Sequence, residues 1–409
     1  SDALNTSWNF WLMMISGCTI GLGTAIFKPP VQGIVAKSLN KENSGFGFGL
    51  FYWVVNVGGF LAPMVASMLR GDTQNPTWHY VFYGAAFVTL FNLVITLLFF
   101  KEPERTPEEI ERQKGKSAGQ VFVETLETLW KDKNMLVFLL IVSGFWLMFM
   151  QLWDLLPNFI DEWVDRRDIG AVIGGIGLES FVDNDSATII LLVLPLSALF
   201  ARYKMMTALI VGMVVSVIGF ILSGLTMNGA VCCLAVFIFA IGEIICSPKF
   251  NEYIGMTAPA DKKAIYMGYS NIPFAIGWAF GNILSGPLYQ VFSSKEVLGR
   301  KFLEANGIDH AGADAAAVMA KVQEQLGGVD VYEANKVLWD MYQPWVIWWI
   351  LGAIGIVSMF GMIVFYYRSG MSRTAEAAGP ECEENAKDVG AEAKTEEHAG
   401  AEAKAGEHA

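Results

Sequence analysis

The amino-acid sequence predicts an all-α membrane protein, and three observations carry that prediction. Of the 409 residues, 54% are hydrophobic and only 17% are charged, and the mean hydropathy is +0.41, which is well above the apolar content of an ordinary soluble domain. Apolar runs of roughly 20 to 30 residues recur along the chain, each long enough to cross a bilayer as a helix. The runs lack the alternation of barrel strands, so helices are the structure that satisfies their backbone polar groups in lipid.

Nine apolar runs are expected to be transmembrane helices. A charged segment separates the first three from the last six, and the run near 184–202 is the shortest. The predicted spans are 8–36, 46–70, 78–100, 135–160, 184–202, 205–226, 229–254, 265–291 and 343–368.

The placement of lysine and arginine predicts the orientation of these spans. The connection before the third span offers only Arg70, whereas the connection after it carries seven basic residues. Because short cytoplasmic loops are enriched in Lys and Arg, we expect the second connection to be cytoplasmic. The later basic loops also fall on alternate connections, which places them on the same side of the membrane. The first span should therefore run from the outside to the cytoplasm, and the C-terminus should be cytoplasmic. The basic residues after the third span are Lys101, Arg105, Arg112, Lys114, Lys116, Lys131 and Lys133.

These features divide the chain into four parts. Residues 1–100 hold three spans, and residues 101–134 form a cytoplasmic linker that ends in an amphipathic helix. In this helix Phe122, Leu126, Leu129 and Trp130 share one face, which we expect to lie against the membrane domain.

Residues 135–368 hold the other six spans and two long outer connections, 161–183 and 292–342. The second connection contains helix-like stretches and could form a small external cap or be a decorative insertion. Residues 369–409 form an acidic tail. From Thr374 onward it has ten acidic residues against three lysines, net −7 of the chain's −12, so we interpret the acidic balance as a disordered, solvated tail.

Few charged residues fall inside the spans, and each one needs a reason because a charge at the bilayer centre costs about 2.5–3.5 kcal/mol on insertion scales. Glu243 lies in "AVFIFAIGEIICSP" behind at least ten largely uncharged residues, about 15–20 Å from the helix end and too deep to reach water. It is either functional or a structural carboxylate paired with a neighbouring helix. Asn56 and Gln151 are polar centres of two other spans and could simply join helices, and Asp154 could be interfacial.

Lys28 lies in "CTIGLGTAIFKPPVQG" and has two readings. If the helix stops at Phe27, the lysine is an interfacial stop signal. However, "VQGIVA" is apolar enough to continue the span to Lys37 and Lys41, and a kink at two prolines is tolerated beside a cavity. We therefore predict that Lys28 lies inside the span.

Three motifs resemble those of the proton-dependent oligopeptide transporter family, within the major facilitator superfamily. They are "GLGTAIFKPPVQG", "FGLFYWVVNVGGF" and "IGEIICSPKFNEYIGMTAPADKKAIYMGYSNIPFAIGWAFGNILSG". The resemblance covers nearly all spans and excludes the tail and the two outer loops. It implies a partial major facilitator fold of about nine helices, three plus six, in which the first span is helix four of twelve and helices one to three are missing. The most specific positions are Phe48, Phe51, Tyr52, Val55, Asn56, Gly58 and Gly59.

The resemblance also implies site residues. It assigns substrate binding to Lys28, Asn56, Gln151 and Glu243. A lysine and a glutamate from opposite halves would hold the two termini of a zwitterion whose charges are roughly 7–10 Å apart, and the amides would meet its peptide bonds.

Two departures from the family pattern bear on these roles. Many members have a glutamate before the seventh-helix glutamine, where this chain has Met150, and Asp154, four residues on, could replace that acid. Glu243 and Asp154 are therefore our candidates for proton coupling. The bulky Trp153 lies beside Asp154, and Ser270 stands where the family often has a tryptophan. Both differences suggest a reshaped pocket.

The function these features predict is proton-coupled symport of di- and tripeptides by alternating access, in what the resemblance suggests is a bacterial inner membrane. The expected partners are a short peptide, protons and the lipid bilayer. An exporter or importer of another small solute, such as a drug or metabolite, is the alternative, and a non-transporting receptor or scaffold is a second one. The sequence holds no catalytic, metal-ligand or nucleotide constellation, so we expect no enzyme activity, metal, cofactor or nucleic-acid partner.

Overall fold

The computed structural model describes residues 2–40, 43–71, 77–101, 116–167, 178–200, 202–259 and 262–369. Within them every regular element is a helix, apart from one isolated bridge between Asp165 and Asn228. The chain forms two units, Ser1–Met359 and Phe360–Ala409. The contacts described below lie within the first unit. Residues 102–115 of the linker and the acidic tail from residue 370 lie outside the described residues.

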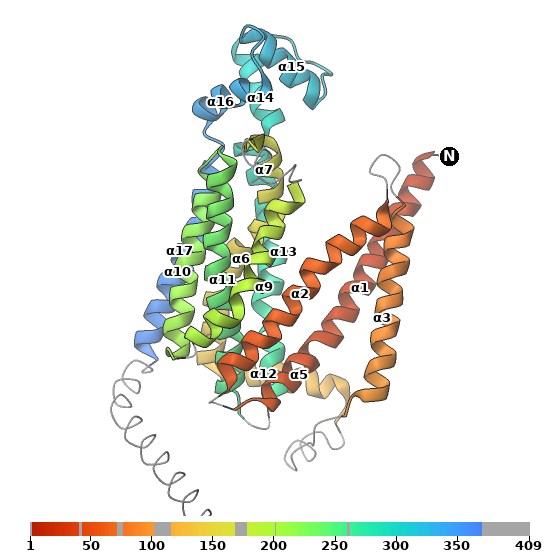
Figure 1. Ribbon diagram of the computed structural model, residues 1–409, viewed down its shortest axis with the longest axis vertical. Coiled ribbons are helices and arrows are strands. Elements are labelled where there is room, and N and C mark those ends of the chain that lie inside the picture. The colour runs from red at the N-terminus through yellow and green to blue at the C-terminus, as the bar shows by residue number, and fades with distance from the viewer. Residues whose placement is uncertain are drawn as a thin grey trace, which may run out of the picture. The chain divides into compact units, whose positions relative to one another are not determined.

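The first three predicted spans are the helices α1 (Asp2–Ser38), α2 (Ser44–Arg70) and α3 (Trp78–Phe99) (Figure 1). Helix α1 continues through Pro29 and Pro30 to Ser38, as predicted, so Lys28 lies within the helix. No residue of α3 is buried. These helices therefore present long apolar surfaces, as lipid-facing helices do.

The last six predicted spans correspond to α6 (Lys133–Asp154), α9 (Leu178–Phe200), α10 (Met205–Gly224), α11 (Gly229–Thr257), α13 (Asn271–Phe292) and α17 (Val346–Arg368). Glycines let α10 and α11 pack at close range. A Cβ added at Gly219 would lie 2.4 Å from the backbone nitrogen of Phe239, and one at Gly242 would lie 2.4 Å from that of Ser216. Such small-residue contacts are how membrane helices gain packing without a hydrophobic driving force.

Seven described helices are long and apolar enough to cross a membrane by length and composition: α1, α2, α3, α6, α10, α11 and α17. The apolar part of α9 is the shorter stretch Asp185–Phe200. The predicted span 265–291 is two helices, α12 (Lys263–Tyr269) and α13, because the chain breaks at Ser270. There the Ser270 hydroxyl donates to the Met267 carbonyl at 2.7 Å, a local bond that competes with the helix ladder.

The predicted span 135–160 also ends early. Helix α6 stops at Asp154, and a short helix, α7 (Leu156–Trp163), starts with Pro157 in its first turn. Proline is favoured there because the first helical N–H groups have no intrahelical partner.

The amphipathic helix of the linker is α5 (Ala118–Lys131), which begins with a capping box between Ser117 and Gln120. The expectation that its apolar face lies against the membrane domain is wrong for most of that face. Leu129 is buried, but the other three apolar residues are exposed, namely Phe122, Leu126 and Trp130. The helix contacts the protein through another edge, where the Tyr269 hydroxyl donates to the Thr125 carbonyl at 2.6 Å.

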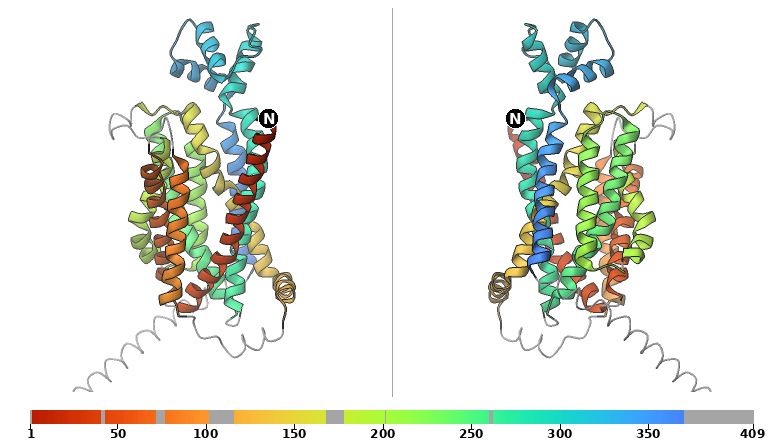
Figure 2. Two further views of the ribbon diagram at one scale, coloured as in Figure 1. Left: turned by 90° about the vertical axis from the view of Figure 1, so that its right-hand side faces the viewer. Right: turned by 90° about the vertical axis from the view of Figure 1, so that its left-hand side faces the viewer.

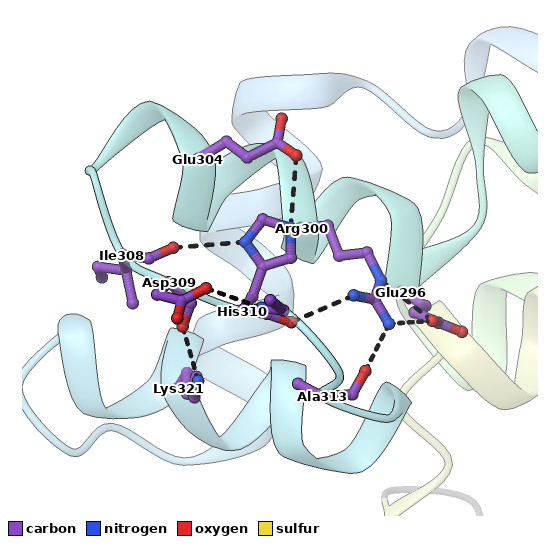
Figure 3. A network of polar contacts seen from close by, with 9 residues as sticks. Glu296, Arg300, Glu304, Ile308, Asp309, His310, Ala313 and Lys321 are labelled. Atoms are coloured by element: carbon purple, nitrogen blue, oxygen red, sulfur yellow. Dashed lines mark hydrogen bonds and ion pairs between the residues drawn. The ribbon is translucent and has the colours of Figure 1, made fainter.

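The connection 292–342, predicted to be on the outer side, folds into three helices, α14 (Lys295–Ala305), α15 (Ala315–Gln325) and α16 (Val331–Tyr342), which we call the cap. Figure 2 shows the cap and α5 at opposite ends of α13. Figure 3 shows the Arg300 guanidinium between the Glu296 carboxylate and the Ala313 carbonyl, at 2.7 and 2.6 Å. This network ties the α14–α15 loop to α14. The small apolar core of the cap is Leu298, Phe302, Leu303, Val318, Val322, Ala334 and Leu338.

Candidate functional site

A buried polar contact joins α2 to α11. Glu243 is only 6% exposed, and the Tyr52 hydroxyl donates to its Oε1 atom. Its other oxygen, Oε2, has no hydrogen-bond partner among the described residues. Glu243 therefore faces the protein interior, where the carboxylate bridges the first three helices and the later ones.

A second buried carboxyl lies on α9, a helix that packs against α11, and the sequence pattern did not indicate it. Asp185 of α9 is fully buried, its charge interacts with that of Glu243, and neither of its oxygens has a partner among the described residues. It escaped notice because it opens the shortest apolar run, next to the polar residues Asp183 and Asn184. The signal that could have found it is its place in the first turn of the apolar stretch Asp185–Phe200.

Apolar side chains surround this pair of carboxyls. Ile189 and Val193 of α9 pack with Ile244 of α11, and Tyr52 and Trp53 of α2 cover them. The Trp53 indole N–H donates to the Ile190 carbonyl at 3.0 Å, which fixes α2 against α9. An ionised group in such surroundings is costly unless it is paired.

Lys28 lies beside aromatic rings, and it makes no ion pair with Glu243. Its ammonium stands 5.0 Å from the centroid of the Phe274 ring, a cation–π distance. Phe274 packs in turn against Trp146 at 4.1 Å and Phe250 at 6.1 Å between centroids. The predicted lysine and glutamate thus belong to two separate clusters, one aromatic and one acidic.

The other predicted site residues have local partners. The Asn56 amide donates to the Tyr52 carbonyl of its own helix at 2.9 Å. Gln151 is buried, donates to the Leu147 carbonyl at 3.1 Å and leaves its Oε1 atom without a partner among the described residues. The Asp154 carboxylate accepts from the Ser285 hydroxyl at 3.0 Å. Gln151 and Asp154 thus lie along the contact between α6 and α13.

A second set of polar contacts joins the two groups of helices near residues 32–44. The Ser44 hydroxyl donates to Glu252 Oε1 at 2.6 Å, and the other Glu252 oxygen lies 2.7 Å from the Lys249 ammonium. All three are buried. The Asn271 amide donates to Gln32 at 3.0 Å. These bonds hold the C-terminal end of α1 and the N-terminal end of α2 against α11 and α13.

A polar cavity of about 670 Å³ lies between α7 and the cap. On its wall, Glu162 accepts hydrogen bonds from the Tyr289 hydroxyl at 3.0 Å and the Lys295 backbone N–H at 2.9 Å. Burial raises the pKa of Glu162 above its ordinary value and outweighs these bonds, which lower it. Among the described residues, no cluster of three or more His, Cys, Asp or Glu side chains could hold a metal ion.

The chain belongs to the Major Facilitator Superfamily, whose family model matches residues 3–282. It is also similar to the Multidrug resistance protein MdtH of Salmonella paratyphi B, Salmonella schwarzengrund and Salmonella paratyphi C. Each is 23% identical over 286 residues, which is 69% of this chain and 65% of the relative. The chain therefore spans less than two thirds of the length of these relatives.

Family membership confirms the predicted fold class, an all-α integral membrane protein with a major facilitator fold. It also confirms the expectation of a non-enzymatic protein, since this is a superfamily of transporters.

Proposed function

We propose that the protein is a proton-coupled secondary transporter that works by alternating access and takes di- and tripeptides as substrates. The superfamily supports transport of a small solute, and the motifs around Lys28, Asn56 and Glu243 support peptides. The proposal includes a bacterial inner membrane location, with the linker and C-terminus in the cytoplasm.

The observation that carries this proposal is the hydrogen bond from Tyr52 of α2 to Glu243 of α11. It joins a helix of the first three to a helix of the last six through a carboxyl that is 6% exposed. Removal from water favours the neutral form of such a group. Binding or loss of a proton there changes the strength of a bond between the two groups of helices, and so shifts the balance between conformations.

Lys28 suits the carboxylate end of a peptide. Its present partner is an aromatic face, an interaction of about 0.5–2 kcal/mol. A charge-assisted bond to a carboxylate is stronger and more directional, so a substrate carboxylate can displace the ring. Glu243 would then meet the peptide amine, and Asn56 and Gln151 its peptide bonds.

A drug exporter is the second candidate, and two observations favour it. The relatives are named multidrug resistance proteins, and the ring cluster of Phe274, Trp146 and Phe250 beside Lys28 would accept a planar apolar solute. In this case the lysine would tune the pocket and need not bind a carboxylate.

Uptake assays with the purified protein in proteoliposomes separate these candidates. With an imposed proton gradient, labelled dipeptide should accumulate, and Glu243→Gln should abolish accumulation while Glu324→Gln, an exposed control in the cap, should not. Lys28→Ala should impair free dipeptide more than a carboxylate-blocked analogue. Competition by lipophilic drugs with no effect of dipeptides would replace the peptide proposal with the exporter.

A further inference from the structure

Two buried carboxyls lie on α9 and α11, helices that pack against each other, and most of their oxygens are unpaired among the described residues. Three of the four oxygens, both of Asp185 and Oε2 of Glu243, have no hydrogen-bond partner among the described residues. Asp185 is fully buried and Glu243 is 6% exposed. Buried polar atoms are nearly always satisfied in folded proteins, so this arrangement indicates a ligand.

Among the described residues, the titratable groups that interact with these two carboxyls are Tyr52 of α2 and Cys246 of α11, and neither carries a positive charge. Within the described part of the chain, no lysine, arginine or histidine forms an ion pair with either carboxyl. Ser247, one turn beyond Glu243, is 3% exposed, and its hydroxyl lies next to that of Tyr52.

We propose that Asp185 and Glu243 form one proton-binding site in which the two carboxyls share a single proton. Two interacting negative charges in an apolar site are costly, so one carboxyl stays protonated while the other is ionised. The ligand we assign is a proton, which needs no oxygen ligands beyond the two carboxyls themselves. The inference rests on the proposed function only in that the proton is taken to drive transport.

Tyr52 makes the site sensitive to the number of protons it holds. Its hydroxyl donates to Glu243 across the contact between α2 and α11, and a bond to an ionised acceptor is stronger than one to a neutral carboxyl. With one shared proton the negative charge holds Tyr52 in place. A second proton removes that charge and weakens the contact between the two helices.

Infrared titration of the purified chain in lipid bilayers tests the shared proton without any transport. The carbonyl-stretch band of protonated carboxyls should fall in two well-separated steps as the pH rises. Asp185→Asn should leave one step for Glu243, with a proton affinity lower by about tenfold or more than that of the upper step in the unchanged chain. Glu324→Gln should leave both steps intact.

Three outcomes overturn the proposal. One is an upper step that survives in Asp185→Asn, and another is joint ionisation of both carboxyls in a single step in the unchanged chain. The third is loss of the band on adding sodium at constant pH, which would make this a metal-cation site.

If Asp185→Asn does not fold, the same infrared titration of Tyr52→Phe tests the proposal. Removing the donor to the ionised carboxyl should raise the proton affinity of the upper step, and an unchanged titration overturns the proposal. Two-step titration in a protein that transports nothing would remove the proposed function and leave this site standing.

Discussion

Lys249 and Glu252 show how a buried charge can be tolerated at a contact between helices. They lie one turn apart on α11, their charged atoms are 2.7 Å apart, and their side chains are 4% and 7% exposed. Glu252 also accepts from Ser44 of α2. A buried pair of this kind adds little net stability, but breaking it leaves an uncompensated charge.

Removing one member of that pair should therefore be costly. We expect Glu252→Ala to lower the free energy of unfolding by about 3–5 kcal/mol, and the double change Lys249→Met with Glu252→Leu to recover most of it. Denaturant titration in detergent measures both. Glu127→Ala is the matched control, because its partner Lys131 is 73% exposed and an exposed pair contributes about 0.3–0.5 kcal/mol. Equal losses for the two alanine variants would contradict the assignment.

Glu162 should make the folding stability depend on pH, and the direction of that dependence can be predicted. Since burial raises its pKa in the folded protein, the folded state binds this proton more tightly than the unfolded chain does. The stabilisation from this proton is fully present below the pKa of Glu162 in the unfolded chain, about 4.3. It is lost as the pH rises through the pKa of Glu162 in the folded protein.

The measurement is the melting temperature of the unchanged chain and of Glu162→Gln between pH 4 and 8, about the range over which a raised glutamate titrates. The difference should favour the unchanged chain most at the acid end and shrink as the pH rises. The control is Glu324→Gln, which should follow the unchanged chain throughout. A difference that grows with pH would mean that hydrogen bonding, and not burial, dominates at Glu162.

At the scale of the elements, close packing between α6 and α13 depends on glycine. A Cβ at Gly277 would lie 2.9 Å from the Trp146 carbonyl oxygen and 3.0 Å from its carbon, whereas a Cβ at Gly286 has nothing within 4 Å. The neighbour at Gly277 is backbone, which cannot rotate away as a side chain can.

Alanine at these two positions should accordingly have opposite effects. Gly277→Ala should destabilise the protein by about 1–3 kcal/mol through overpacking, and Gly286→Ala should be neutral or stabilise it by up to about 1 kcal/mol. Thermal unfolding of both variants in one detergent checks this. The account of the α6–α13 contact fails if both variants melt alike.

The sequence predicted the helices well and their breaks poorly. Hydrophobic length located the spans because every residue in a run contributes to the signal. The interruptions at Leu155 and Ser270 depend on one or two residues in a local contact, such as the Ser270 hydroxyl on the Met267 carbonyl. The amphipathic pattern of α5 was also visible, but which edge meets the protein was not, because the exposed face of Phe122, Leu126 and Trp130 is equally suited to lipid.

At the scale of the whole molecule, the candidate site was predictable in part. Depth in an apolar run identified Glu243 and Lys28, since burial of a charge is costly wherever the helix lies. Their partners were not predictable, because Tyr52, Asp185 and Phe274 reach them from other helices. The predicted pairing of the lysine and glutamate through one substrate stays a prediction, and in the structure each has its own neighbours.

Two of the contacts between the first three helices and the rest involve buried carboxylates, at Tyr52 with Glu243 and at Ser44 with Glu252. The central claim is that the proton number at Glu243 controls whether these helices stay together. If so, the ends of α1 and α11 near Ser44 should separate when the pH changes, and a neutral residue at 243 should remove that response.

The measurement that tests this most directly is the distance between spin labels at Ser38→Cys of α1 and Thr257→Cys of α11, in protein whose five native cysteines have been replaced. We predict two distance populations whose ratio changes with pH in otherwise unchanged protein and stays fixed in Glu243→Gln. A single distance at every pH, or the same pH response in Glu243→Gln, would contradict the account.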